Sequence, residues 1–180
     1  MTDYDVVLLI EQPFTSTDAT NLRGLHDTIE EPVRYHVLLP VEDARARVET
    51  AMGTLTSSEG LQASPEPPAV PPAELDELQE ELLSTSRDGV AATVAAIEQA
   101  GGRAVGETVS QDPVAALVAK VGEVDAREVI ILTRPHVVAE FFHLDWTSKA
   151  RRRLGVPVLH LLEHENFDEQ AGEGEGISGF

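Results

Sequence analysis

The chain has 180 residues, with 13 Lys and Arg against 32 Asp and Glu and no Cys, so its formal net charge is −19. The lack of Cys excludes disulfides, Cys-ligated zinc and thiol catalysis. The acidity argues against nucleic acid or an anionic membrane as a partner, because both are bound by clustered cations. No apolar run is long enough to span a bilayer, and the first residues lack the basic start of a signal peptide. We therefore expect a cytoplasmic protein that binds neither nucleic acid nor membrane.

Length and local composition predict one domain with two low-complexity segments. A chain of this size is typical of a single domain, which we place at residues 1–165. Five of the 11 prolines lie between residues 57 and 73, and proline fixes φ and lacks an amide donor, so we expect an extended insertion there. Residues 166–180 are acidic and rich in glycine, which predicts a disordered tail.

The periodicity of apolar residues predicts alternating strands and helices. In chain order, strands are expected at 6–10, 35–41, 103–109, 129–133 and 156–162. Helical spacing joins Leu22, Leu25 and Ile29, with Ser16, Thr17 or Asp18 as the cap. Further helices are expected at 44–55, at 75–97 and at 137–154, and Gly89 can break the second of these. Another helix is expected after Asp112, which would cap it, with Pro113 at its first position. Apolar strands linked by helices predict an α/β fold, namely a five-stranded parallel sheet with helices on both faces.

Ligands of such folds bind at the carboxyl ends of the strands, so the candidate sites are short loops. Glu11 follows the first strand without any glycine nearby, which excludes a dinucleotide fingerprint and a P-loop. The fourth strand leads into Thr133, Arg134 and His136, where Arg134 can clamp a phosphate and His136 can titrate near neutral pH. The alternative is a solvated loop in which Arg134 pairs with one of the surplus carboxylates.

Neither catalysis nor metal binding is indicated by the remaining polar residues. No nucleophile, base and acid follow the spacing of a known hydrolase motif, so we predict no catalytic residue. The histidines at 136, 143, 160 and 164 lack the spacing that puts two ligands on one helical turn, so we predict no metal site. The basic run 149–153 lies at the end of a predicted helix, where cations complement the helix dipole.

The chain resembles the universal stress protein family from about Asp5 to Glu163, apart from much of Glu42–Ala73, and the resemblance is strongest over the last third. The run Asp125–His136 is similar to the family's fourth strand and its loop, and Gly155–Leu159 is similar to its closing strand. The resemblance implies the strand order 3-2-1-4-5 and a homodimer formed through the last strand. It also implies ligand contacts at Glu11, at the Val41 backbone near an adenine, and at Thr133 and Arg134.

The chain departs from the family at the phosphates. ATP-binding members carry glycines in a G-x2-G-x9-G-[ST] pattern after the fourth strand, whereas residues 134–148 contain none here. We therefore expect a non-enzymatic regulatory or stress-response homodimer that has no cofactor and binds ATP weakly or not at all. One alternative is a nucleotide-binding or ATP-hydrolysing member that uses Thr133, Arg134, His136 and Thr147. Another is an interaction module that recruits a partner through the acidic tail.

Overall fold

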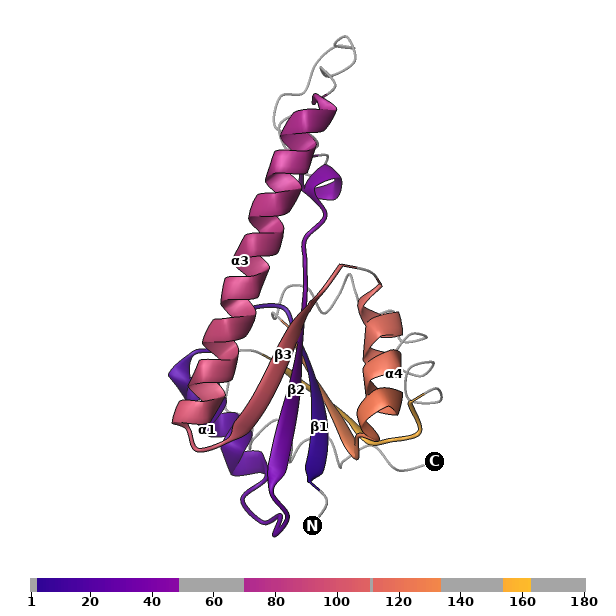
Figure 1. Ribbon diagram of the computed structural model, residues 1–180. Helices are drawn as coiled ribbons and strands as arrows, with labels where there is room; N and C mark the ends of the chain where they lie inside the picture. The colour runs from indigo at the N-terminus through magenta and orange to yellow at the C-terminus, as the bar shows by residue number, and fades with distance from the viewer. Residues whose placement is uncertain (1–2, 49–69, 111, 134–153, 163–180) are drawn as a thin grey trace, which may run out of the picture.

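The computed structural model describes residues 3–48, 70–110, 112–133 and 154–162 (Figure 1). Its five strands are β1 (Tyr4–Ile10), β2 (Val33–Pro40), β3 (Arg103–Val109), β4 (Glu128–Thr133) and β5 (Val158–Leu162). They pair in parallel in the order β3-β2-β1-β4-β5. The predicted fold class and strand order are therefore confirmed.

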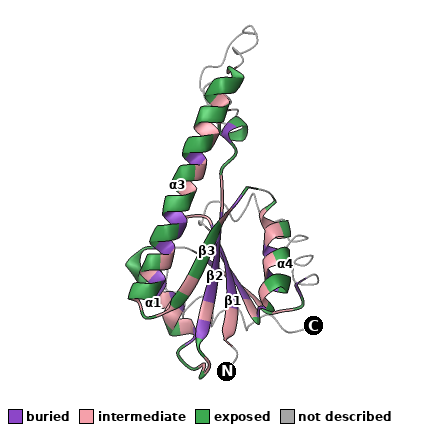
Figure 2. Cartoon of the chain, in the orientation of Figure 1, coloured by how far each residue is buried: buried purple, intermediate pink, exposed green. Residues whose placement is uncertain are grey.

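Helices cover both faces of this sheet. The named helices are α1 (Ser16–Leu25), α3 (Pro72–Gln99) and α4 (Pro113–Val124), and residues 44–48 are also helical. Side chains alternate along β1, so Val6, Leu8 and Ile10 pack in the cluster that includes α1 and α3 residues. Val7 and Leu9 belong to the opposite cluster, with residues of α4. The continuous apolar run of β1 thus reflects a strand that is buried on both faces (Figure 2). Among the described helices, none is both long and apolar enough to cross a membrane.

Helix α1 differs from its prediction at both ends. Its N-cap is Thr15, and Asp18 acts three residues later as the partner in a capping box rather than as the cap itself. The helix ends at Leu25, and His26 follows as the C-cap. Ile29 therefore lies outside the helix, although it still packs against the core beside Leu25. Ile29 fits the helical spacing because the turn after α1 places its side chain against the same core cluster that Leu25 contacts.

Helix α3 is one unbroken helix of 28 residues, roughly 42 Å long. It begins at Pro72, so the last two residues of the expected insertion, Pro72 and Ala73, belong to the helix. A proline at the first helical position loses no hydrogen bond, because that amide has no partner within the helix. The break considered at Gly89 does not occur. The first part of α3 extends beyond the sheet (Figure 1).

Four predictions fall wholly or partly on residues outside the described part of the chain. These are the helix at 44–55 beyond residue 48, the helix at 137–154 apart from Leu154, most of the Pro-rich insertion, and the acidic tail at 166–180. The strand expected at 156–162 is shorter than predicted, because β5 begins at Val158. Pro157 precedes it and still joins the ladder through its carbonyl, which accepts a bond from the Val129 amide at 2.9 Å.

Candidate functional site

The carboxyl ends of β1, β2 and β4 form the candidate site. We call residues 11–18 after β1, residues 41–44 after β2 and Thr133 the carboxyl edge. Ile10 pairs with Leu132, so the residues that follow them, Glu11 and Thr133, occupy neighbouring positions. The strand order reverses between β1 and β4, which is where α/β sheets bind ligands. The other predicted site residues, Arg134, His136 and Thr147, lie outside the described residues.

The loop after β1 is anchored to α3. The amide of Phe14 donates to Thr93 Oγ1 at 3.0 Å, and that hydroxyl donates in turn to the Gly89 carbonyl at 2.9 Å. Thr93 has no exposed surface and Phe14 is buried. This buried polar contact fixes the loop at the point where a ligand would approach it. Thr93 was not predicted as a site residue.

The N-terminus of α1 is closed by a carboxylate of the chain itself. Asp18 Oδ2 accepts bonds from the Thr15 amide at 2.9 Å and from the Thr15 hydroxyl at 2.7 Å. Thr15 Oγ1 accepts in turn from the Asp18 amide at 3.2 Å. Asp18 is only 2% exposed. A helix N-terminus is a favourable place for a phosphate because its amides point outward and its dipole end is positive. In this chain that place already holds a negative charge.

The segment after β2 is also bonded within the protein. The amide of Val41, whose backbone was predicted to lie near an adenine, donates to the Val109 carbonyl at 2.8 Å. The Gln79 side chain on α3 accepts from the Ala44 amide at 2.9 Å and donates to the Glu42 carbonyl at 3.2 Å. Val41 therefore extends the β2–β3 ladder, and Gln79 holds the residues that follow it.

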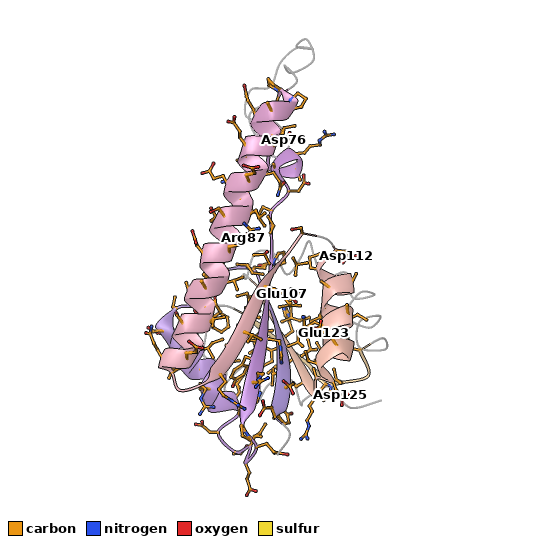
Figure 3. All side chains as sticks on the ribbon, in the orientation of Figure 1. Asp76, Arg87, Glu107, Asp112, Glu123 and Asp125 are labelled. Carbon is orange, nitrogen blue, oxygen red and sulfur yellow. The ribbon has the colours of Figure 1, made fainter. Side chains whose placement is uncertain are left out.

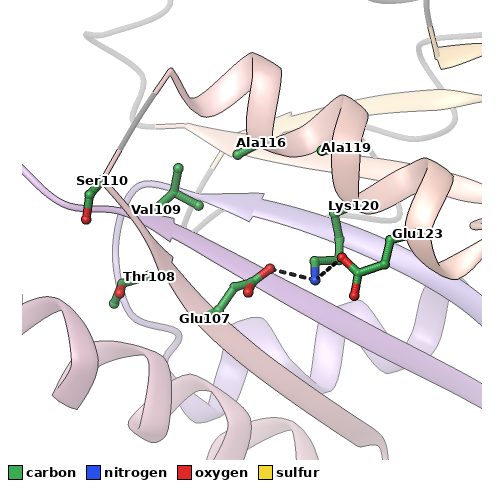
Figure 4. A pocket seen from close by; sticks show the side chains of 8 residues that line it. All are labelled: Glu107, Thr108, Val109, Ser110, Ala116, Ala119, Lys120 and Glu123. Atoms are coloured by element: carbon green, nitrogen blue, oxygen red, sulfur yellow. Dashed lines mark hydrogen bonds and ion pairs between the residues drawn. The ribbon is translucent and has the colours of Figure 1, made fainter.

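A groove of about 440 Å³ lies beside this edge, between β3 and α4 (Figure 4). Lys120 reaches across it, with its Nζ 2.8 Å from a Glu107 oxygen and 2.7 Å from a Glu123 oxygen. Burial opposes the charged form of Lys120, but the hydrogen bonds to the two carboxylates outweigh it and raise its pKa. The groove is lined by Glu107, Thr108, Val109, Ser110, Ala116, Ala119, Lys120 and Glu123. Its lysine is paired with two carboxylates, so the groove does not favour a phosphate.

Carboxylates lie at the two ends of α4 rather than along it. Asp112 lies at the N-terminus of α4 and Glu123 near its C-terminus, while Glu107 belongs to β3 (Figure 3). Asp112 caps α4 by accepting from the amides of Val114 and Ala115 at 2.8 and 3.3 Å. Among the described residues, no group of three or more acidic or histidine side chains is placed to hold a metal ion.

A buried polar network occupies the opposite end of the sheet. The Tyr35 hydroxyl lies 3.0 Å from His26 Nδ1, and His26 Nε2 lies 3.3 Å from a Glu128 oxygen. Burial raises the pKa of Tyr35 to about 12. A second cavity of about 330 Å³ adjoins His26 near the start of β3. Because the strands enter the sheet at this end, the network lies away from the carboxyl edge and joins the C-cap of α1 to β2 and β4.

These observations define an α/β protein with a parallel sheet, a ligand edge at the strand reversal, and internal partners for several groups on that edge. No protein-family model matches the sequence. A search of the curated proteins also gave no match. The fold is that of the universal stress proteins, as comparison with solved structures shows.

Three of these structures align over nearly their whole length. The hypothetical protein MJ0577 is 12% identical, with a TM-score of 0.59 over 90% of this chain and 97% of that one. UspA from Lactobacillus plantarum is 13% identical, with a TM-score of 0.52 over 89% and 99%. A universal stress protein family protein from Arabidopsis thaliana, solved with AMP bound, is 10% identical, with a TM-score of 0.50 over 92% and 94%. At these identities the likeness concerns the fold, and it confirms the predicted resemblance at that level.

Proposed function

We propose that this chain is a non-enzymatic regulatory protein of the universal stress protein type, which acts as a homodimer and binds ATP weakly or not at all. One observation carries the proposal: backbone amides of the carboxyl edge are already bonded within the chain. They belong to Phe14, Thr15, Asp18, Val41 and Ala44. Backbone amides are the groups that hold phosphates at such edges. A nucleotide would have to break these bonds to use the same donors.

Charge and sequence support weak ATP binding. The buried Asp18 carboxylate lies at the α1 N-terminus, and the whole chain carries a formal charge of −19. Both repel a polyphosphate. Residues 134–148 contain no glycine that would let further amides approach it.

The proposed dimer uses β5. This strand is at the edge of the sheet, and among the described strands it pairs only with β4. An apolar edge strand is prone to aggregation unless something covers it. A second copy of β5 across a twofold axis would protect both edges at once. Light scattering at tens of micromolar is expected to give twice the chain mass, and the mass of a single chain would contradict the dimer.

A nucleotide-binding role is the second candidate, because the Arabidopsis protein of the same fold holds AMP. In that case Thr133, Arg134, His136 and Thr147 would contact the ligand in place of glycines. Calorimetric titration with MgATP and with AMP separates the two candidates. We expect dissociation constants weaker than about 1 mM, that is, less than about 4 kcal/mol of binding free energy. Micromolar binding that Arg134→Ala abolishes and the control Arg87→Ala retains would establish the second candidate instead.

A further inference from the structure

Helix α3 contacts both loops of the carboxyl edge. The Thr93 hydroxyl accepts a hydrogen bond from the Phe14 amide, and at Gly89 the helix lies directly against Pro13. Gln79 lies fourteen positions before Thr93, roughly 21 Å along the same helix, and its side chain forms hydrogen bonds with the backbone of Glu42 and Ala44. One helix therefore holds the loop after β1 at one point and the loop after β2 at another.

These contacts are mechanically linked because α3 is continuous between them. The helix runs without a break from Pro72 to Gln99. Val90 and Ile97 are buried in the core cluster against the sheet, and Leu82 is buried nearer to Gln79. A hydrogen-bonded helix anchored in this way moves as one body rather than residue by residue. A displacement of α3 at one loop is therefore felt at the other.

We infer that α3 is an autoinhibitory strap, which holds the two loops of the carboxyl edge closed as one cooperative unit. Thr93 and Gln79 are its positioning residues, because each satisfies backbone groups of one loop. When either contact is lost, both loops open together and their amides become available. The inference rests on the proposed function only for its consequence, the exclusion of nucleotide from this edge.

Amide hydrogen exchange of the full chain tests the strap without any ligand. Thr93→Val removes the acceptor for the Phe14 amide at nearly unchanged volume, and Gln79→Ala removes both bonds to the loop after β2. Each variant is expected to raise exchange about tenfold in residues 11–18 and also in residues 41–47, while α4 is unchanged. Thr85→Val and Gln99→Ala make the same chemical changes at exposed positions of α3 and should alter neither loop.

Three outcomes would overturn the strap. They are faster exchange only in the loop that the substituted side chain contacts, no change in either loop, and a change as large in α4 as in the loops. Thr93 is fully buried, so its variant can fail to fold; Gln79 is partly exposed, and its variant then decides the result. A wild-type chain that binds ATP tightly would overturn the proposed function, whereas uncoupled loops would overturn the strap alone.

Discussion

Gly89 of α3 lies so close to Pro13 of the loop after β1 that no side chain fits between them. A Cβ at residue 89 would fall 2.8 Å from Pro13 Cγ and 3.0 Å from Leu39 Cδ2. Glycine in a helix interior is less stable than alanine by about 1 kcal/mol, so its presence here needs a reason. The reason is the close approach, which also lets Thr93 reach the Phe14 amide one turn further along the helix.

Gly89→Ala is therefore expected to lower the free energy of unfolding. Overpacking against a proline ring costs about 1–3 kcal/mol, and the gain in helix propensity offsets about 1 kcal/mol of it. The matched control is Gly122→Ala on α4, where nothing lies within 4 Å of the added Cβ. That variant should be more stable by about 0.5–1 kcal/mol. Urea unfolding measures both, and equal stabilisation of the two variants would contradict the close contact.

Asp18→Ala should weaken the fold and strengthen phosphate binding at once. Loss of the capping box costs about 1 kcal/mol. Removing the negative charge from the α1 N-terminus should improve the binding free energy of an anion at that place by up to about 1 kcal/mol, or roughly fivefold in affinity. Asp112→Ala removes the cap of α4 and should cost similar stability without this gain. Urea unfolding and calorimetric titration with ATP are the measurements. If the affinity of Asp18→Ala for ATP equals that of Asp112→Ala, the carboxylate does not exclude phosphate.

Sequence periodicity predicted the fold well because the sheet is buried on both faces. The run from Val6 to Ile10 is apolar at every position, as expected for a strand that is covered on both faces. The ends of the helices were less predictable. The local sequence around Pro72 fits both an extended segment and the first residue of a helix. A glycine such as Gly89 fits both a break in a helix and a close contact with a neighbouring segment. Only the tertiary structure decides between these readings.

The candidate site was predicted only in part. Glu11 and Thr133 were predicted at the ends of their strands, and the structure places them at neighbouring positions there, although no ligand contact of either is tested. Asp18 could have been assigned its role from the Thr15-x-x-Asp18 pattern, which is that of a capping box. Thr93 and Gln79 gave no local signal, because their partners lie 79 and 35 residues away in the sequence.

Lys120→Met tests whether the groove beside α4 is held together by charge. Methionine keeps the apolar stem and removes the ammonium, so Glu107 and Glu123 lose their shared partner. Both carboxylates are more than half exposed, at 51% and 65%, so we expect a loss of only about 1 kcal/mol. A double-mutant cycle with Glu107→Gln, compared with one using Glu123→Gln, assigns the loss to the contact with β3 or to the one within α4. No coupling in either cycle would show that the lysine contributes by packing alone.

Alkaline unfolding should report on Tyr35. Burial raises the pKa of its hydroxyl to about 12, whereas in the unfolded chain it titrates near 10. Between these values the unfolded chain loses the proton and the folded protein keeps it, so stability falls as the pH rises. A shift of this size corresponds to about 2–3 kcal/mol. The full loss is reached only above the folded-state pKa, so urea unfolding at pH 9 and pH 11 should show about half of it, roughly 1.3 kcal/mol.

The chain has only two tyrosines, which gives a matched pair of variants. Tyr35→Phe loses the contact with His26, which costs about 1 kcal/mol at pH 9, but its stability should change much less between pH 9 and pH 11. Burial also raises the pKa of Tyr4, though this residue is only partly buried, so Tyr4→Phe should keep most of the alkaline loss. Lys120 adds a loss of the same sign in all three proteins, and the comparison cancels it. An equal fall in Tyr35→Phe and the wild-type chain would show that this hydroxyl is not the group that titrates.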